Sequence, residues 1–301
     1  MVERYIEFLG LDETIELLNA NERPLTPSIR VNTLKIEVKT IKKRLENKGF
    51  ALEPIKWVEY GFNISKYPFN LGALHEYLQG FYYIQSVATM LPALILNPHT
   101  NDVVIDMCAA PGGKATHLAQ IMNNQGKLIL LERNERRIPA LEVNLRRMGI
   151  TNSIVLNHDA THLEKLNIKA DRILLDAPCT GEGLIRQDKS RKKSKNINDI
   201  KKMASVQKKL LSAGLNALKP NGKLLYSTCS IGPEENELVV NDILKINPNF
   251  SIIRIPKQYG VHGLTEVYGV TYRNDLKFTQ RIYPHIHDTI GFFLCLITRL
   301  E

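Results

Sequence analysis

The C-terminal two thirds of the chain alternates short apolar runs with segments in which apolar residues recur at helical spacing. The apolar runs predict strands at 102–108, 127–132, 153–159, 172–178 and 222–229, and a late strand at 288–298. The helical spacing predicts helices at 114–123, 135–148, 199–218 and 233–245. Strands that are apolar on both faces and separated by helices are typical of a parallel sheet covered on both sides. The sequence therefore predicts a doubly wound α/β domain.

A smaller β-α-β pattern precedes this region, over residues 28–59. A β-rich run leads into apolar residues at helical spacing, and a second β-rich run follows a glycine. A unit of this size predicts either a small α+β domain of the ferredoxin-like or RNA-recognition type, or a structural extension of the larger domain. We assign residues 1–75 to the small domain and residues 76–301 to the large one.

Composition and charge narrow the class of protein. No apolar stretch of the 301-residue chain approaches the roughly 20 residues that a membrane span needs, and the start "MVERYIEFLG" lacks a signal-peptide pattern. We therefore expect a cytoplasmic protein with no membrane partner. Its four cysteines lie singly, which argues against a disulfide framework and against a zinc site. The net charge of +9 favours a polyanionic partner. No obligate protein partner is evident, and we expect a monomer.

Charged or reactive side chains end the predicted strands of the large domain: Asp106, Glu132, Asp159, Asp176 and Cys229. Ligands of doubly wound sheets bind outside the carboxyl ends of the strands, so these side chains are expected at one rim. Each acid alone could instead cap a helix or stabilise a turn. Five such positions in register favour a binding site.

The first predicted strand is followed by "AAPGGKATHLA" (109–119), a glycine-containing turn that opens into a helix. Glu132 ends the next strand, where an acid can bind ribose hydroxyls. The turn is not GxGxxG, and Asp106 would repel a pyrophosphate but not a sulfonium amino acid. These features favour S-adenosylmethionine over NAD.

Four segments, "DMCAAPGGKATHLA", "DAPCTGEG", "YSTCSIGPEENE" and "RIYPHIHDTIGFF", together resemble the Sun family of RNA cytosine carbon-5 methyltransferases. The resemblance extends from "SIRVNTLK" (28–35) to the end of the chain. It implies a Rossmann-like methyltransferase sheet with an antiparallel last strand, preceded by a small RNA-recognition-like domain. It also implies S-adenosylmethionine as cofactor and RNA as partner, with tRNA favoured and rRNA second. The loop after "DAPCTGEG" departs from the family because it lacks a proline.

The resemblance also implies roles for individual residues. The methionine end of the cofactor would lie against the first motif, which comprises Asp106, Cys108, Ala109, Ala110, Pro111, Gly112, Gly113 and Lys114. Glu132 would bind the ribose, Asp159 the adenine side, and Arg137 lies in the second motif. Asp176 would lie beside the target base as well as the cofactor. Lys114 could serve either the cofactor or the base.

Two cysteines suit methyl transfer to cytosine, because carbon 5 of the ring is a poor nucleophile until a thiolate adds at carbon 6. Asp176, bonded to ring nitrogen 3 and the amino group, would stabilise the charge that develops. Spacing alone does not say which thiol attacks. DNA cytosine methyltransferases use the cysteine of a Pro-Cys pair, here Cys179. The Sun family resemblance assigns attack to Cys229 and leaves Cys179 to assist product release.

Two other functions compete with RNA methyl transfer. A DNA cytosine methyltransferase should lack Cys229 and carry a large recognition insert. A catalytically silent RNA-binding scaffold would be favoured by loss of either cysteine or of Asp176, and all three are present. A basic run at 186–202 follows Cys179 and contains Lys189, Arg191, Lys192, Lys193 and Lys195. Such a run is either a solvated face or a grip on RNA phosphates.

Overall fold

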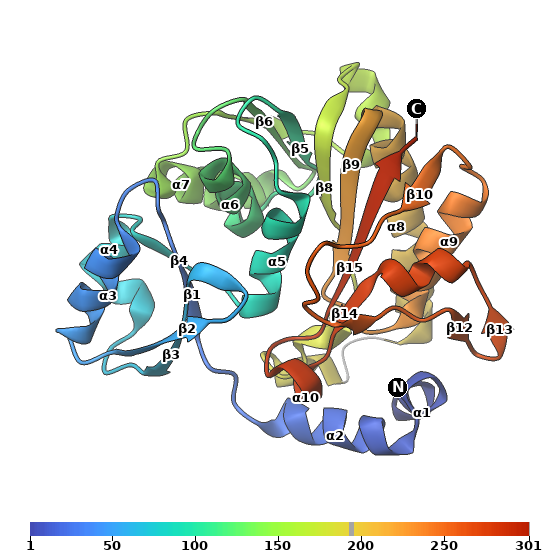
Figure 1. Ribbon diagram of the computed structural model, residues 1–301, viewed down its shortest axis with the longest axis horizontal. Helices are drawn as coiled ribbons and strands as arrows, with labels where there is room; N and C mark the ends of the chain where they lie inside the picture. Colours follow the sequence, from blue (N-terminus) through green and yellow to red (C-terminus); the bar gives the residue numbers. More distant parts are fainter. Residues whose placement is uncertain (193–195, 301) are drawn as a thin grey trace. The chain divides into compact units, whose positions relative to one another are not determined.

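The computed structural model describes residues 1–192 and 196–300. These residues form two compact units: Thr26–Asp159 is one, and Met1–Leu25 together with Ala160–Glu301 is the other. Figure 1 labels the helices and strands of both units. The domain boundary that we place between residues 75 and 76 stays a prediction.

The unit Thr26–Asp159 begins with a four-stranded antiparallel sheet in the order β2-β3-β1-β4. Its strands are β1 (Ser28–Val31), β2 (Ala51–Ile55), β3 (Val58–Lys66) and β4 (Tyr82–Ile84). Helix α3 (Val38–Glu46) follows β1, and η1 (Leu71–Ala73) and α4 (His75–Leu78) precede β4. Ile41 and Leu45 of α3 are fully buried in one cluster with Ile29 and Val31 of β1. This β-α-β-β-α-β order is the ferredoxin-like arrangement, one of the two alternatives that the pattern at 28–59 left open.

The same unit continues with three parallel strands in the order β5-β6-β7. The elements are α5 (Val87–Leu96), β5 (Val103–Asp106), α6 (Gly113–Ile121), β6 (Lys127–Glu132), η2 (Glu135–Arg137), α7 (Ile138–Met148) and β7 (Ser153–Asn157). The prediction that β7 extends to Asp159 is wrong. Asn157 is paired with Glu132, the last residue of β6, so the ladder has no partner for residues beyond it. Asp159 therefore lies in the loop after the strand.

The second unit contains the parallel strands β8 (Ala170–Asp176) and β9 (Leu218–Thr228), connected through helix α8 (Ile197–Ala217). Helix α8 begins two residues before the predicted start because Asn196 and Asp199 form a capping box. Strand β15 (Phe292–Arg299) pairs antiparallel with β9, which confirms the antiparallel last strand. Figure 1 shows α8 and α9 (Glu237–Lys245) beside these strands.

Short elements complete this unit. Strands β14 (Gln280–Ile282) and β10 (Phe250–Ile252) both pair with β15, and β11 (Val261–His262) pairs with β14. The remaining elements are α1 (Val2–Leu9), α2 (Leu11–Glu22), η3 (Ala160–Leu166), η4 (Glu182–Leu184), η5 (Lys189–Lys192), η6 (Pro233–Glu235), β12 (Glu266–Val267), β13 (Val270–Thr271), η7 (Asn274–Phe278) and α10 (Pro284–His287). Among the described residues, no helix has the length and apolar character of a membrane span.

Candidate active site

The two cysteines singled out by the sequence lie at the ends of neighbouring parallel strands. Cys179 follows β8 and Cys229 follows β9, and their Sγ atoms are 3.0 Å apart. Asp176, the last residue of β8, is paired in register with Ser227, whose hydroxyl donates to Asp176 Oδ1 at 2.9 Å. The parallel register thus brings both thiols and a carboxylate to the same edge, as the strand-end pattern predicts for Asp176 and Cys229.

The pKa of the Cys179 thiol is raised well above its usual range. The largest cause is the hydrogen bond with Cys229, followed by burial, and the negative charges of Glu235 and Asp176 add to it. Burial and nearby anions both disfavour the thiolate. Cys179 is therefore held as a neutral thiol near neutral pH.

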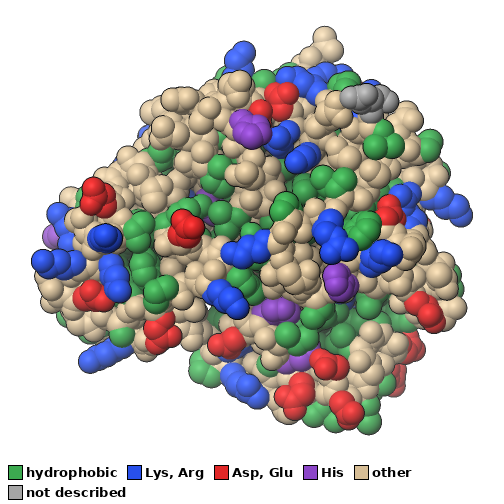
Figure 2. All heavy atoms as spheres, in the orientation of Figure 1, with side chains coloured by type: hydrophobic (Ala, Val, Ile, Leu, Met, Phe, Trp, Pro, Cys, Tyr) green, Lys and Arg blue, Asp and Glu red, His purple; other side chains and the backbone are tan. Residues whose placement is uncertain are grey.

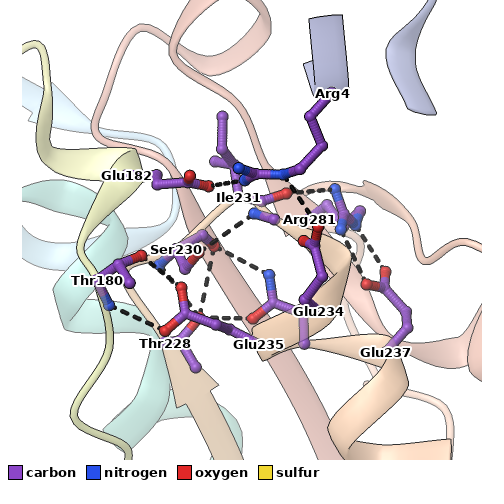
Figure 3. A network of polar contacts seen from close by, with 12 residues as sticks. Arg4, Thr180, Glu182, Thr228, Ser230, Ile231, Glu234, Glu235, Glu237 and Arg281 are labelled. Atoms are coloured by element: carbon purple, nitrogen blue, oxygen red, sulfur yellow. Dashed lines mark hydrogen bonds and ion pairs between the residues drawn. The ribbon is translucent and has the colours of Figure 1, made fainter. Parts of the chain in front are cut away.

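The backbone on both sides of Cys179 is held by two buried side chains, Glu235 and Gln207. Thr180 donates to the Glu235 carboxylate through its backbone N–H at 2.9 Å and through its hydroxyl at 2.5 Å, as Figure 3 shows. Gln207 Nε2 donates to the Pro178 carbonyl at 2.8 Å and to Glu235 Oε1 at 3.0 Å. Both Glu235 and Gln207 are completely buried. The turn that carries Cys179 is thereby fixed on either side of the thiol.

A second set of hydrogen bonds fixes the turn that carries Cys229. The Thr228 hydroxyl donates to Asn236 Oδ1 at 2.6 Å, and Asn236 Nδ2 donates to the Ser230 carbonyl at 3.1 Å. The Ser230 N–H donates to the Thr228 hydroxyl at 3.1 Å. The Cys229 carbonyl accepts from the N–H of Gly183 in η4 at 2.9 Å. Thr228, Ser230 and Asn236 are all fully buried.

Ion pairs support both turns (Figure 3). Arg4 of α1 pairs with Glu182 of η4 and, through Nε at 3.0 Å, with Glu234 of η6. Arg281 of β14 forms a buried two-bond pair with Glu237 of α9, at 2.6 and 2.8 Å. These residues are missed by the sequence analysis, although "GPEENE" contains Glu234, Glu235 and Glu237. The signal that could have found them is the density of acids directly after a cysteine motif.

In the unit Thr26–Asp159, the first motif forms the turn between β5 and α6. Asp106 is buried at the end of β5, and its Oδ1 accepts from the Cys108 N–H at 3.2 Å. Residues 108–112 form the turn, and Gly113 and Lys114 begin α6. Gly112 has φ of 106°, a conformation that a side chain would strain. A turn that leads into a helix N-terminus exposes backbone N–H groups to a ligand.

Glu132 and Arg137 lie together beside this turn. Glu132 is 4% exposed at the end of β6, and its Oε1 accepts from the Asn134 N–H at 2.9 Å. Arg137 NH1 lies 3.1 Å from Glu132 Oε2, and its NH2 donates to the Ala110 carbonyl. Asp159 is partly buried in the loop after β7. Two buried carboxylates at successive strand ends and a glycine turn fit a ligand with an amino-acid end and a ribose, so these residues suit S-adenosylmethionine.

Arg30 is a further residue that the sequence analysis missed. It lies on β1, is fully buried, and donates to the Gly113 carbonyl at 2.7 Å and to the Thr116 hydroxyl at 2.8 Å. Its NH1 also donates to Gln85 Oε1 at 2.9 Å. Burial lowers the pKa of Arg30. An arginine inside an apolar β-rich run, "SIRVNTLK", is the signal that could have found it.

The basic run at 186–202 is partly engaged within the protein. Arg186 is buried and donates to the Arg23 and Pro24 carbonyls, at 3.2 and 2.9 Å. Lys189 and Lys192 pair with Glu22 of α2. Lys193 and Lys195 lie outside the described residues. Figure 2 shows lysine and arginine side chains spread over the visible face with acidic ones among them.

Within residues 1–192 and 196–300, no group of three or more His, Cys, Asp or Glu side chains is arranged to hold a metal ion. Chemically, the pair of thiols beside Asp176 can form a covalent bond to a substrate with one sulfur and retain a proton on the other.

Comparisons with known proteins agree on one family. A family model described as 16S rRNA methyltransferase RsmB/F matches residues 93–298, and the N-terminal domain of 16S rRNA methyltransferase RsmF matches residues 1–87. The chain is 37% identical over 301 residues to the tRNA (cytosine(49)-C(5))-methyltransferase of Pyrococcus abyssi, covering 99% of this chain and 95% of the relative. It is 36% identical over 307 residues to the 25S rRNA (cytosine-C(5))-methyltransferase nop2 of Schizosaccharomyces pombe, covering 100% of this chain and 50% of the relative.

Solved structures give the same picture. A methyltransferase homologue protein from Pyrococcus horikoshii superposes with a TM-score of 0.90 at 39% identity, covering 99% of this chain and 94% of that one. NSun6 from the same organism, crystallised with SFG, superposes with a TM-score of 0.89 at 25% identity, covering 100% and 97%. The chain spans half or less of the length of the eukaryotic rRNA methyltransferases that it matches.

Proposed function

This chain belongs to the RsmB/F methyltransferase family, which confirms the Sun family prediction, and from that premise we propose that it methylates carbon 5 of a cytosine in RNA. The observation that carries the proposal is the pair of thiols 3.0 Å apart beside Asp176. The competing DNA methyltransferase and silent scaffold are not favoured, because the relatives are named as RNA methyltransferases and the reactive residues are all present.

S-adenosylmethionine is the cofactor of this family and supplies the methyl group. The first motif, Asp106 and residues 108–114, would bind its methionine end. Glu132 would accept hydrogen bonds from the ribose hydroxyls, and Arg137 would keep that carboxylate oriented toward them. Asp159 would lie on the adenine side. Lys114, in the first turn of α6, would bind the cofactor carboxylate or assist at the base.

Cys229 is the proposed nucleophile. Its thiolate would add to carbon 6 of the cytosine, which forms a carbon–sulfur bond and makes carbon 5 electron-rich enough to accept a methyl group. Asp176 would bind ring nitrogen 3 and the amino group and stabilise the charge that arises on the ring. Loss of the carbon-5 proton to a base would then expel Cys229 and restore the aromatic ring.

Cys179 is proposed to act in release rather than in attack. Its raised pKa keeps a proton on sulfur, and a neutral thiol is a poor nucleophile. It lies within hydrogen-bond distance of Cys229, so it can exchange a proton with that sulfur as the bond to carbon 6 breaks. This division of roles is what the two thiols support best.

We propose tRNA as the substrate class, with rRNA second. The support is the relative from Pyrococcus abyssi, which is named a tRNA methyltransferase and is covered by this chain over 95% of its length. We also propose that the protein acts as a monomer without an obligate protein partner.

The test combines purified protein with cellular RNA. Bisulfite sequencing of total RNA, with and without the gene, should show one or a few cytosines that lose protection when the gene is absent. The purified protein with S-adenosylmethionine should restore methylation at those cytosines, and Cys229→Ala should not. Restoration on DNA but not on RNA would contradict the proposal.

A further inference from the structure

We propose that two consecutive residues, Glu235 and Asn236, position the two active-site thiols separately, Glu235 acting on Cys179 and Asn236 on Cys229. Neither residue touches the reacting atoms in this proposal. Each acts through the backbone next to one cysteine. The inference rests on the proposed function, because it assigns different steps of that reaction to the two positioning residues.

The hydrogen bonds of Glu235 converge on the neighbours of Cys179. Thr180, the next residue, donates to both carboxylate oxygens, and Gln207 links Glu235 to the Pro178 carbonyl on the other side. A buried carboxylate is stable only when hydrogen-bond donors surround it. The Thr180 N–H, the Thr180 hydroxyl and Gln207 Nε2 therefore fix the position of Glu235, and Glu235 in turn fixes theirs. The path of the chain through Cys179 is therefore set by a side chain that lies 56 positions later in the sequence.

Asn236 holds the neighbours of Cys229 in the same way but with different chemistry. Its Oδ1 accepts from the Thr228 hydroxyl and its Nδ2 donates to the Ser230 carbonyl. Only an amide offers an acceptor and a donor at these two atoms, because a carboxylate has no hydrogen to donate. Asn236 thus closes a ring of bonds around Cys229 that aspartate could not close.

The segment that carries both residues is itself anchored. The Tyr226 hydroxyl donates to the Glu235 carbonyl at 2.5 Å. Glu234, one residue earlier, pairs with Arg4, and Glu237, one residue later than Asn236, pairs with Arg281 (Figure 3). Because the segment is fixed at both ends, the side chains of Glu235 and Asn236 have a fixed origin from which to set the two thiols.

The two residues should therefore fail in opposite ways. Loss of the Glu235 hydrogen bonds beside Cys179 should impair release, so the covalent RNA adduct on Cys229 should accumulate. Loss of the Asn236 hydrogen bonds beside Cys229 should impair attack, so little adduct should form. A merely structural role would reduce folding or all steps together and would not separate the two outcomes.

The experiment compares Glu235→Ala with Asn236→Asp in the full chain, using end-labelled tRNA transcript and S-adenosylmethionine. Denaturing gels measure the adduct, and methyl incorporation measures turnover. We expect Glu235→Ala to raise the steady adduct fraction about tenfold and to lower turnover, and Asn236→Asp to slow adduct formation by about 10²-fold, the scale of a misplacement near 1 Å. Glu235→Gln should restore turnover, since its carbonyl can still accept from Thr180 N–H and its amide can donate to the Thr180 hydroxyl.

Matched variants keep the test decisive. Glu266→Gln changes an exposed glutamate of β12, outside the segment 233–237, and it should behave as wild type. If Glu235→Ala or Asn236→Asp does not fold, Gln207→Leu and Thr228→Val remove the opposite partner of the same bonds and should give the same two phenotypes. Thermal melts report folding in every case.

Cys179→Ala and Cys229→Ala, measured in parallel, separate the two ideas. The inference requires each positioning variant to reproduce the phenotype of its own cysteine variant. If Cys179→Ala traps adduct and Glu235→Ala does not, the inference is overturned while the proposed function stands. If Cys229→Ala still forms adduct, the proposed assignment of the nucleophile fails. The inference then still requires Glu235→Ala to behave like Cys179→Ala and Asn236→Asp to behave like Cys229→Ala, and it is overturned if either pair differs.

Discussion

The turn around Cys179 and the turn around Cys229 are built alike and differ in charge. Each follows a parallel strand, and each has a neighbour of its cysteine bonded to a buried side chain from the segment 233–237. Asn236 bonds to both neighbours of Cys229, whereas Glu235 bonds to Thr180 and reaches Pro178 through Gln207. The side chain is an anion for Cys179 and a neutral amide for Cys229. The anion contributes to the raised pKa of Cys179, after the hydrogen bond with Cys229 and burial. The anion beside the Cys179 turn suits a thiol that keeps its proton, and the turn of Cys229 has no such anion bonded to the neighbours of its cysteine.

Replacing each cysteine in turn by alanine should give the largest effects, because the two thiols are proposed to act in different steps. Cys229→Ala should abolish methylation and form no covalent complex, because no sulfur adds to carbon 6. Cys179→Ala should transfer methyl once and then stall with RNA bound to Cys229. The stalled complex is a thioether, so its band on a denaturing gel should survive reducing agent. An adduct in Cys229→Ala and none in Cys179→Ala would reverse the assignment and make Cys179 the nucleophile.

Asp176 should produce the next largest effect, because it lies at the end of β8 with a hydrogen bond from Ser227 and is proposed to act on the base. Asp176→Ala should slow adduct formation itself by about 10²–10⁴-fold, the range for a positioned acid or base. Rapid-quench measurement of the adduct against time reports this step alone. Ser227→Ala keeps the carboxylate and removes its bond, and should cause a smaller loss. Unchanged adduct formation with slow methyl transfer would place Asp176 after the attack.

The bounds of a strand can be predicted from the sequence where neighbouring residues determine them, and cannot where a partner strand determines them. Strand β6 was predicted with its observed bounds, because an apolar run between polar residues determines where it starts and stops. Strand β7 was predicted two residues too long, since its end is set by where its partner β6 ends. The antiparallel last strand came from the family resemblance rather than from the pattern.

The chemistry of the site divides in the same way. Asp106, Glu132 and Asp176 were predictable as strand-end acids because each directly follows an apolar run. Asp159 was not, because β7 ends two residues before it. Glu235 and Asn236 were not predictable, because their partners lie 6 to 55 residues away and a run such as "GPEENE" is typical of solvent-exposed surface. Arg186 was grouped with a basic run, yet it is buried and bonded to the backbone at Arg23 and Pro24. Whether a charged side chain is buried depends on tertiary contacts, so the composition of the surrounding segment does not predict it.

Glu132 extends the comparison to the cofactor, since it should affect binding without altering either thiol. Glu132→Ala should weaken S-adenosylmethionine binding by about 1–3 kcal/mol, the scale of lost hydrogen bonds to a charged group, while the protein stays folded. Calorimetric titration measures the affinity. Glu135→Ala, an exposed acid in η2, is the matched control and should bind as wild type. Equal affinity in a folded Glu132→Ala protein would remove Glu132 from the cofactor site.

The smallest effect tests the charge difference between the two turns. Cys179 should react with iodoacetamide only at a pH above the range of an ordinary cysteine thiol, because its folded pKa is raised and the reactive thiolate forms late as pH rises. Glu235→Gln keeps the hydrogen bonds but removes a negative charge, so the midpoint for Cys179 should move to lower pH. Mass spectrometry of the Cys179 peptide across a pH series gives both midpoints. Glu234→Gln removes the same charge from the neighbouring position, where the carboxylate already pairs with Arg4, and should leave the midpoint unchanged. If the midpoint in Glu235→Gln rises or stays in place, Glu235 acts on Cys179 through geometry alone, and the electrostatic difference between the turns has its origin in burial and in the second thiol.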